Sequence, residues 1–172
     1  MGIKLNIMYL LSSFNSGGAE KMITEFFEEA KNHENANFLL VVMNDKFDEK
    51  LKQRIENTGY KCIFLNRKEG KLDLKYLFEL RKIIKKNKID IINSHNYGSK
   101  FWSILCKMII PKLKLFFTIH SIAAFKGQNG LKIFLHNLFI DENIAISDSV
   151  KDVSEKNGIK RIKRIYNGIN TK

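Results

Sequence analysis

A length of 172 residues suits one domain that buries roughly 70% of the surface exposed by its unfolded chain. The apolar content of 44% and charged content of 28% are ordinary for a globular protein, and the longest apolar runs are too short to cross a bilayer. The formal charge of +12 is carried by 25 lysines against 5 arginines. Compositional bias is one explanation of this excess of lysine. Weak attraction to anionic lipid or to a phosphorylated substrate is another. Nucleic-acid binding is disfavoured, because it usually relies on arginine and on stacked aromatic side chains.

The N-terminus and the cysteines indicate a cytosolic protein. Polar Lys4 and Asn6 come early, and no small-residue cleavage site follows an apolar core, so we expect no signal peptide. Cys62 and Cys106 lack metal-ligand spacing, so we interpret them as reduced thiols in the core.

The first half of the chain alternates strand-length and helix-length apolar patterns. The expected strands cover residues 3–11, 38–43 and 60–65, and the expected helices cover residues 19–30, 46–57 and 73–87. Asp73 is a suitable cap for the third helix. Four apolar residues of that helix are predicted to face inward: Leu74, Leu77, Phe78 and Ile84.

The second half continues the alternation. The expected strands cover residues 89–93, 113–119, 143–146 and 161–166, and the expected helices cover residues 97–110, 130–140 and 147–157. The helix at 130–140 carries an apolar side made of Leu131, Phe134, Leu135 and Leu138. Residues 100–114 mix apolar residues with Lys100, Lys107, Lys112 and Lys114. Such a segment suits a membrane interface, but a buried helix flanked by solvated lysines is favoured.

Strands separated by helix-length segments predict right-handed crossovers and an α/β fold with a doubly wound, mostly parallel, Rossmann-like sheet. In the common strand order the first and fourth strands are neighbours, and ligands bind beyond the carboxyl ends of the strands. The loop at residues 12–18 would then face the loop at residues 93–98 across a crevice. Polar residues follow five strands, so we expect one site at this edge.

Several residues at this edge suit ligand chemistry. Gly17 and Gly18 let a ligand approach the main chain, although Ser16 or Gly17 also suits a helix cap. His95 and His120 follow neighbouring strands, and each can hydrogen-bond a substrate hydroxyl. Alternatively, either histidine only hydrogen-bonds the backbone of its own loop. A metal site is not expected, because two histidines without clustered carboxylates or thiols make a poor ligand set.

The order of motifs resembles the N-terminal half of GT-B-fold glycosyltransferases of the large retaining family 4. Five segments carry the likeness in sequence order: residues 17–20 (GGAE), 89–95 (IDIINSH), 117–120 (FTIH), 144–147 (IAIS) and 165–170 (IYNGIN). The last segment departs from the family's I-P-N-G-hydrophobic-D pattern at Tyr166 and Asn170.

The resemblance implies transfer of a sugar from a nucleotide-sugar donor to an acceptor hydroxyl with retention, without metal or cofactor. Residues 1–172 would form the acceptor-side domain, and a nucleotide-binding C-terminal domain would be absent from this chain. The implied roles are catalysis near the transferred sugar for His120, donor-phosphate contact for Gly17 and Gly18, acceptor contact for Ser16, His95 and Asn96, and the cleft edge for Ser147 and Asn167.

The resemblance also implies a carbohydrate or lipid-linked acceptor of bacterial cell-envelope polysaccharide, and a place in the cytoplasm or at the inner membrane face. Two alternatives remain open at this point. One is a nucleotide-sugar 2-epimerase of the same fold, which would use carboxylates and histidine for proton transfer. The other is a stand-alone basic module that binds an anionic lipid or polymer.

Overall fold

The computed structural model describes residues 4–30, 35–70 and 72–166. Within these ranges seven strands alternate with six helices. The strands are β1 Leu5–Leu11, β2 Ala36–Asn44, β3 Lys61–Arg67, β4 Ile91–Ser94, β5 Lys114–Ile119, β6 Glu142–Ala145 and β7 Ile162–Arg164. The helices are α1 Gly18–Glu29, α2 Glu49–Glu56, α3 Lys75–Lys86, α4 Tyr97–Ile109, α5 Gly130–Phe139 and α6 Asp148–Lys156.

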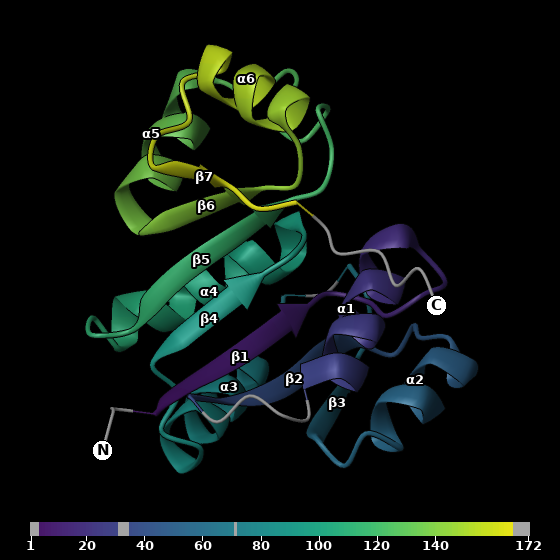
Figure 1. Ribbon diagram of the computed structural model, residues 1–172. Helices are drawn as coiled ribbons and strands as arrows, with labels where there is room; N and C mark the ends of the chain where they lie inside the picture. The colour runs from purple at the N-terminus through teal and green to yellow at the C-terminus, as the bar shows by residue number, and fades with distance from the viewer. Residues whose placement is uncertain (1–3, 31–34, 71, 167–172) are drawn as a thin grey trace.

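All seven strands are parallel and lie in the order β3-β2-β1-β4-β5-β6-β7 (Figure 1). Leu10 of β1 pairs with Val41 on one side and with Ser94 on the other, so the strand order reverses direction between β1 and β4. This point is where open α/β sheets bind ligands. The predicted doubly wound parallel sheet is therefore confirmed, including the pairing of the first and fourth strands.

Two hydrophobic cores lie on opposite faces of the sheet. Helices α1 and α2 lie in front of the sheet in Figure 1, and α3 and α4 lie behind it. The front core joins α1 and α2 to β1 and β2, with Phe27 and Ile55 fully buried. The larger back core joins α3, α4 and the loop residue Phe125 to the middle of the sheet.

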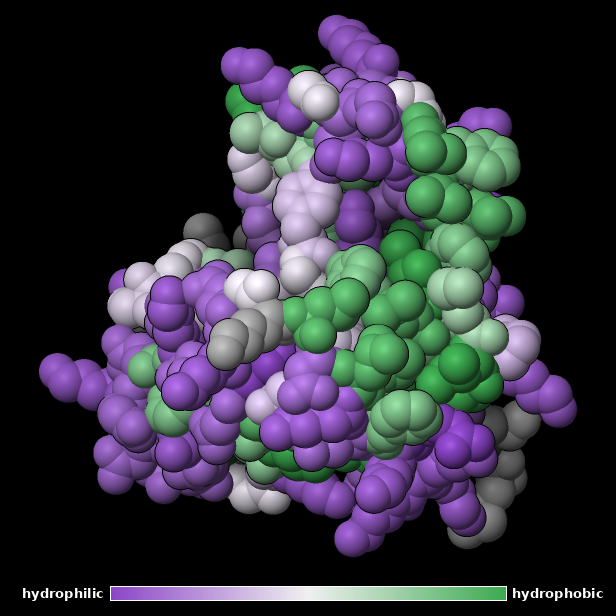
Figure 2. Space-filling view, turned by 180° about the vertical axis from the view of Figure 1, so that it is seen from behind, coloured by the Kyte–Doolittle hydropathy of each residue, from purple (hydrophilic) through white to green (hydrophobic). Residues whose placement is uncertain are grey.

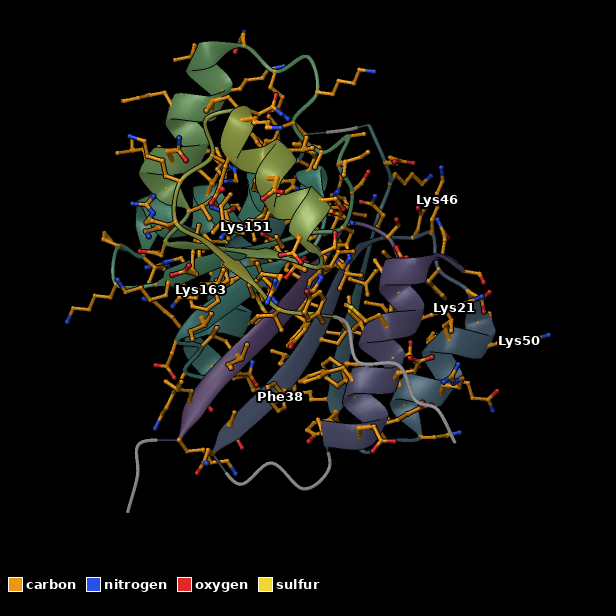
Figure 3. All side chains as sticks on the ribbon, turned by 45° about the horizontal axis from the view of Figure 1, so that its top comes forward. Lys21, Phe38, Lys46, Lys50, Lys151 and Lys163 are labelled. Atoms are coloured by element: carbon orange, nitrogen blue, oxygen red, sulfur yellow. The ribbon has the colours of Figure 1, made fainter. Side chains whose placement is uncertain are left out.

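An aromatic cluster fills the front core. The ring of Phe27 lies 5.4 Å from those of Tyr9 and Tyr60, centroid to centroid, and 5.7 Å from that of Phe26. Phe38 of β2 completes the cluster at 5.0 Å from Phe26 (Figure 3). Edge-to-face contacts of this kind stabilise beyond the area they bury, so aromatic packing adds to the aliphatic contacts that hold this half of the sheet.

Helix α3 confirms only part of the predicted inward face. Ile84 is buried and Leu77 is partly buried, but Leu74 and Phe78 are exposed. The buried residues of the helix are Tyr76, Leu80 and Ile84. Apolar residues surround more of this helix than the sheet can cover, so spacing alone does not select the buried side. The helix begins at Lys75, and the Asp73 side chain accepts a hydrogen bond from its backbone N–H at 3.0 Å.

The prediction for residues 100–114 is wrong in two respects. Lys100 is buried rather than solvated, whereas Phe101, Met108 and Ile109 are exposed. Trp102 and Cys106 are buried, and Ile104 and Leu105 are partly buried against the core, so this side of the helix fulfils the expectation of a buried apolar helix. In the part of the chain that the structure describes, no helix has the length and apolar character needed to cross a membrane.

The two cysteines are free thiols, as predicted. Cys106 is buried in α4 and Cys62 is partly buried in β3. Burial raises the pKa of each thiol to about 12, which keeps the reactive thiolate form scarce at neutral pH.

Candidate functional site at the carboxyl edge of the sheet

His95 and His120 form the centre of the candidate site. His95 follows β4 and His120 follows β5, and these strands are neighbours in the sheet. The Nδ1 atom of His95 lies 2.9 Å from the Nε2 atom of His120, which is a hydrogen-bond distance. The prediction that these side chains stand at the same edge is therefore confirmed, although their predicted roles stay predictions.

The histidine pair is uncharged at neutral pH. His95 is buried, and both this burial and the adjacent His120 hold the pKa of His95 well below its usual range. Burial also lowers the pKa of His120. One proton is thus shared along the Nδ1–Nε2 hydrogen bond, since two protons facing each other would repel.

The surroundings of His95 determine which nitrogen carries that proton. The Nε2 atom of His95 is buried without a hydrogen-bond partner among the described residues. A buried N–H group without an acceptor is rarer than a buried acceptor without a donor. Nε2 of His95 is therefore the unprotonated nitrogen, and Nδ1 of His95 carries the proton and donates a hydrogen bond to Nε2 of His120. The Nδ1 atom of His120 then carries the other proton and is a neutral donor available to a ligand.

Tyr9 supports the histidine pair, a role that the sequence did not reveal. Its ring stacks on His95 at 5.3 Å between centroids and 18° between planes. Burial raises the pKa of Tyr9 to about 12, so the phenol stays neutral. The apolar run of β1 indicated only a core strand, because the stacking depends on the register between β1 and β4.

The glycine loop lies between β1 and α1, at the same edge. Gly17 is the N-cap of α1 with φ −111°, and neither Gly17 nor Gly18 has a positive φ. Neither glycine therefore uses the left-handed backbone conformation that glycine adopts most readily. A Cβ atom on Gly18 would meet no atom within 4 Å, whereas one on Gly17 would lie 2.4 Å from the Glu20 carboxylate. The Gly18 backbone is thus accessible to a ligand.

The loops after β1 and β4 touch one another. Oδ1 of Asn96 accepts hydrogen bonds from Oγ of Ser12 at 2.6 Å, from the Ser12 backbone at 3.2 Å and from the Ser99 backbone at 3.1 Å. The predicted crevice is therefore closed at this level. Gly98 permits the contact, because a Cβ atom there would lie 2.2 Å from Oγ of Ser12. Asn96 therefore caps α4 and joins the two loops. Its predicted role was contact with the acceptor substrate, and the sequence did not indicate this structural one.

The remaining predicted site residues are more peripheral. Ser16 is exposed before α1. Ser147 is the N-cap of α6, where its Oγ atom accepts a hydrogen bond from the Val150 backbone at 3.2 Å. Asn167 lies outside the described residues.

A second polar cluster is buried beneath α4 and α5. Nζ of Lys100 lies 3.2 Å from Nδ1 of His136, and Nε2 of His136 lies 2.9 Å from Oδ1 of Asn143. Burial lowers the pKa of Lys100 to about 8. Burial and then the Lys100 charge lower the pKa of His136 to about 3. His136 is therefore a structural residue of the interior.

Three lysines labelled in Figure 3 are paired with acidic residues. Lys46, Lys151 and Lys163 lie 2.7, 3.8 and 3.6 Å from their partners, respectively. Lys21, also labelled there, lies in the first turn of α1, next to the glycine loop. The start of α1, with its backbone N–H groups and this lysine, is therefore the candidate for contact with an anion.

A metal site and a pocket at the other edge of the sheet are the two alternatives to the carboxyl edge. The described ranges contain no group of three or more His, Cys, Asp or Glu residues that could hold a metal, and the prediction of a metal-free reaction stays a prediction. An open hollow lies at the amino edge of the sheet, lined in part by Leu5, Ile91 and Lys112. Asp90 and Lys114 line it as well, but Asp90 accepts a hydrogen bond from the Asn6 backbone and Lys114 is paired with Asp141. The hollow also lies at the opposite end of the strands from the histidine pair, so the carboxyl edge remains the candidate.

Comparison with protein families gives one match that spans most of the chain. Residues 16–172 match the model described as Glycosyltransferase Family 4. No curated protein matches the chain.

Solved structures share the fold at low sequence identity. A glycosyltransferase from Rickettsia africae ESF-5 superposes with a TM-score of 0.77 and 19% identity, covering 97% of this chain and 44% of that one. The lipopolysaccharide outer core galactosyltransferase WaaB gives 0.67 and 17%, covering 98% and 47%. A UDP-GlcNAc 2-epimerase from Methanocaldococcus jannaschii, solved with UDP-GlcNAc and UDP, gives 0.67 and 16%, covering 95% and 47%. The chain thus spans less than half the length of these structures.

Proposed function

The chain belongs to glycosyltransferase family 4, and from that premise we propose that it is the acceptor-side, N-terminal domain of an enzyme that transfers a sugar from a nucleotide-sugar to an acceptor hydroxyl with retention. The observation that carries the proposal is the 2.9 Å His95–His120 pair at the carboxyl edge, beside the β1–β4 reversal. The short coverage of the similar structures supports a second domain, which would hold most of the nucleotide.

In the proposed reaction, the bond between the anomeric carbon and the diphosphate breaks, and a bond to the acceptor oxygen forms. The acceptor's hydroxyl proton leaves with the diphosphate. Neutral His120 donates a hydrogen bond from its Nδ1–H group to a hydroxyl of the transferred sugar. His95, on which Tyr9 stacks, holds the His120 ring in place through the Nδ1–Nε2 hydrogen bond. Backbone N–H groups near Gly18 contact the diphosphate, where negative charge grows as the bond breaks.

The remaining features of the proposal concern partners and location. The acceptor is a carbohydrate or a lipid-linked carbohydrate of the bacterial cell envelope, with Ser16 on the acceptor side of the site and Ser147 at the edge of the cleft. We propose that the enzyme works in the cytoplasm at the inner membrane face, without a metal. The chain's +12 charge supports attraction to an anionic surface.

The decisive experiment uses the protein encoded by the complete gene. Purified enzyme is incubated with UDP- and GDP-sugars, and the release of nucleotide is measured with and without a membrane extract as the source of acceptor. His120→Ala should lower turnover about 100-fold or more while the circular dichroism spectrum is unchanged. Lys112→Ala, at the opposite sheet edge, is the control. Unchanged turnover in His120→Ala would remove this residue from the proposed mechanism.

The epimerase alternative is supported only by shared fold, since the similar epimerases are at most 17% identical. An epimerase also needs acid–base carboxylates, and Glu20 is the one acidic side chain that the described contacts bring to the glycine loop. Conversion of a nucleotide-sugar to its 2-epimer without any acceptor would favour this alternative over transfer.

A further inference from the structure

Helix α4 buries a charged side chain although it leaves apolar ones exposed. Lys100 is 8% exposed, whereas Phe101 and Met108 are 46% and 60% exposed. Figure 2, seen from behind, shows hydrophobic side chains gathered over the side of the sheet on which α4 lies. Burying an ammonium group costs free energy unless specific partners compensate for the lost water. The partners of Lys100 therefore indicate what this buried charge does.

The Lys100 ammonium group is enclosed by aromatic rings. Its Nζ atom lies over three of them, at 4.4 Å from the ring centroid of Tyr97, 4.8 Å from that of Phe117 and 5.3 Å from that of Phe125. It also lies 3.2 Å from Nδ1 of His136. A cation over the face of a ring is attracted by the ring's quadrupole, most strongly where water is excluded. We call these five residues the lysine cage.

Hydrogen bonds fix the ammonium group within the lysine cage. The side chain of Asn143 donates to the Lys160 backbone at 2.9 Å, and its Oδ1 atom lies 2.9 Å from Nε2 of His136. Since Oδ1 can only accept, Nε2 of His136 carries the ring proton, and Nδ1 accepts a hydrogen bond from Lys100. The lowered pKa of His136, about 3, keeps its ring neutral. The ammonium group is thus held at one point, around which the rings are arranged.

The lysine cage also anchors the segment between β5 and α5. Residues 120–129, which we call the β5–α5 loop, contain neither helix nor strand. Phe125 is the one buried residue of this loop. The side chain of Gln128 donates a hydrogen bond to the phenolic oxygen of Tyr97. Both attachments of the loop therefore end on the lysine cage.

His120 is the first residue of the anchored loop. Phe117 lies three residues before it in β5, and Phe125 lies five residues after it, so rings on both sides of His120 face the same ammonium group. The five residues from His120 to Phe125 span at most about 17 Å, which limits where the His120 backbone can lie. The 2.9 Å distance from His120 to His95 depends on that placement.

We propose that Lys100 is a positioning residue for sugar transfer, whose ammonium group fixes Phe125 and the β5–α5 loop and thereby holds the ring of His120 in place. Lys100 acts through the lysine cage and does not touch the substrate. The inference rests on the role given to His120 in the proposed function. A measurement on the loop alone keeps the two apart, because the loop can be anchored by Lys100 whether or not His120 takes part in transfer.

The first test is hydrogen exchange of the protein encoded by the complete gene, measured at pH 7. The backbone N–H groups of Ala124, Lys126 and Gln128 are hydrogen-bonded within the β5–α5 loop, so their exchange reports its opening. Lys100→Met keeps the length of the side chain and removes the charge. These amides should exchange about tenfold faster in Lys100→Met, while those of α1 exchange as in wild type.

The control is a second lysine of α4. Lys107 is partly buried and pairs with Asp141, away from the β5–α5 loop. Lys107→Met should lower the melting temperature and leave both the exchange of the loop and the turnover unchanged. It therefore shows what the loss of a merely structural lysine does.

The second test is turnover. Lys100→Met should lower kcat about tenfold and change KM for the nucleotide-sugar less than twofold, because His120 is misplaced while donor binding is retained. Phe125→Leu, which removes the ring on the other side of the contact, should have a similar effect. In the double variant the two losses should not multiply, because both act through one contact.

Two outcomes would overturn the inference. They are loop exchange that Lys100→Met leaves unchanged, and losses of kcat that multiply when Lys100→Met is combined with Phe125→Leu. Faster loop exchange together with unchanged turnover in both Lys100→Met and His120→Ala would instead uphold the anchor and reject the proposed function. If Lys100→Met does not fold, Phe125→Leu, which keeps the Lys100–His136 bond, serves for both measurements.

Discussion

Helices α1 and α2 bury mainly apolar residues, whereas α4 and α5 also bury a charged and polar cluster. In α1 the buried residues include Ile23 and Phe27, and in α2 they are Leu51 and Ile55. Helix α4 buries Lys100 beside Trp102 and Cys106, and His136 is the buried residue of α5. Both pairs of helices pack on the same parallel sheet, so the difference lies in the polar groups that the second pair encloses.

The comparison indicates that one sheet carries two kinds of structural unit. The half built on β1–β3 is a conventional apolar core, closed by charged helices that face water. The half built on β4–β6 encloses the cluster of Lys100, His136 and Asn143 within an apolar core and leaves apolar residues of α4 and α5 exposed. We expect the second half, which encloses these buried titratable groups, to dominate the response of stability to pH.

The largest expected effect tests the apolar half. Phe27→Ala removes the ring at the centre of the aromatic cluster and should lower the free energy of unfolding by about 3–5 kcal/mol. Phe134→Ala removes an equal side chain from an exposed position of α5 and should cost less than about 0.5 kcal/mol. Urea unfolding followed by Trp102 fluorescence measures both. Similar losses in the two variants would end the contrast between the halves.

The second effect tests the polar interior in acid. The pKa of His136 is about 3 in the folded chain, below its ordinary value of 6.5, because of burial and the nearby Lys100 charge. The unfolded chain therefore takes up more protons as the pH falls below 6.5, and stability decreases. His136 should account for a loss of about 2 kcal/mol between pH 6.5 and 5.

His136→Gln should flatten that part of the curve, because glutamine can hydrogen-bond both Lys100 and Asn143 without titrating. The histidine pair at the carboxyl edge also has lowered pKa values and remains in the variant, so the difference between the two curves isolates His136. Parallel curves would show that His136 does not titrate as inferred.

The third effect concerns Lys100 in base. Burial lowers the Lys100 pKa from its ordinary 10.5 to about 8, so the unfolded chain binds more protons between these values and stability rises with pH. Wild type should gain about 1–2 kcal/mol between pH 7.5 and 9.5, relative to Lys100→Met. The cysteines titrate equally in both proteins and cancel in the difference. A gain that persists in Lys100→Met would assign it elsewhere.

The smallest effect concerns the seam between the halves. Gly98→Ala places a Cβ atom 2.2 Å from Oγ of Ser12, which disrupts the Ser12–Asn96 hydrogen bonds. We expect a loss of about 1–2 kcal/mol. Gly130→Ala, where a Cβ atom meets nothing within 4 Å, is the matched control and should be neutral or slightly stabilising. Equal melting temperatures for the two variants would contradict the close contact at Gly98.

The sequence was sufficient for the sheet and for the meeting of His95 with His120. Parallel strands end at one edge, so residues that follow neighbouring strands must meet there, and alternation alone establishes this. The sequence could not predict the backbone conformation of the glycine loop, because the spacing of glycines does not reveal their φ angles. It also could not assign Asn96 to a loop contact, because the partner Ser12 lies 84 residues away.

The orientation of the helices was the larger failure. In α3, α4 and α5 apolar residues cover more of the circumference than the sheet can bury, so periodicity allows several buried sides. Lys100 and His136 determine which side of α4 and α5 is buried. Burial of either side chain requires the hydrogen bond to the other, which lies 36 residues away in the sequence. Isolated lysines are expected at the surface, and only the tertiary pairing overrides that expectation.

Asn96 also couples the two sides of the strand-order reversal. Its Oδ1 atom accepts hydrogen bonds from Ser12, after β1, and from the Ser99 backbone in the first turn of α4. Its neighbour in the chain is His95, whose Nδ1 atom lies 2.9 Å from Nε2 of His120. A displacement of the loop after β1 would therefore be transmitted through Asn96 to the histidine pair, so that this loop and the histidines move as one unit.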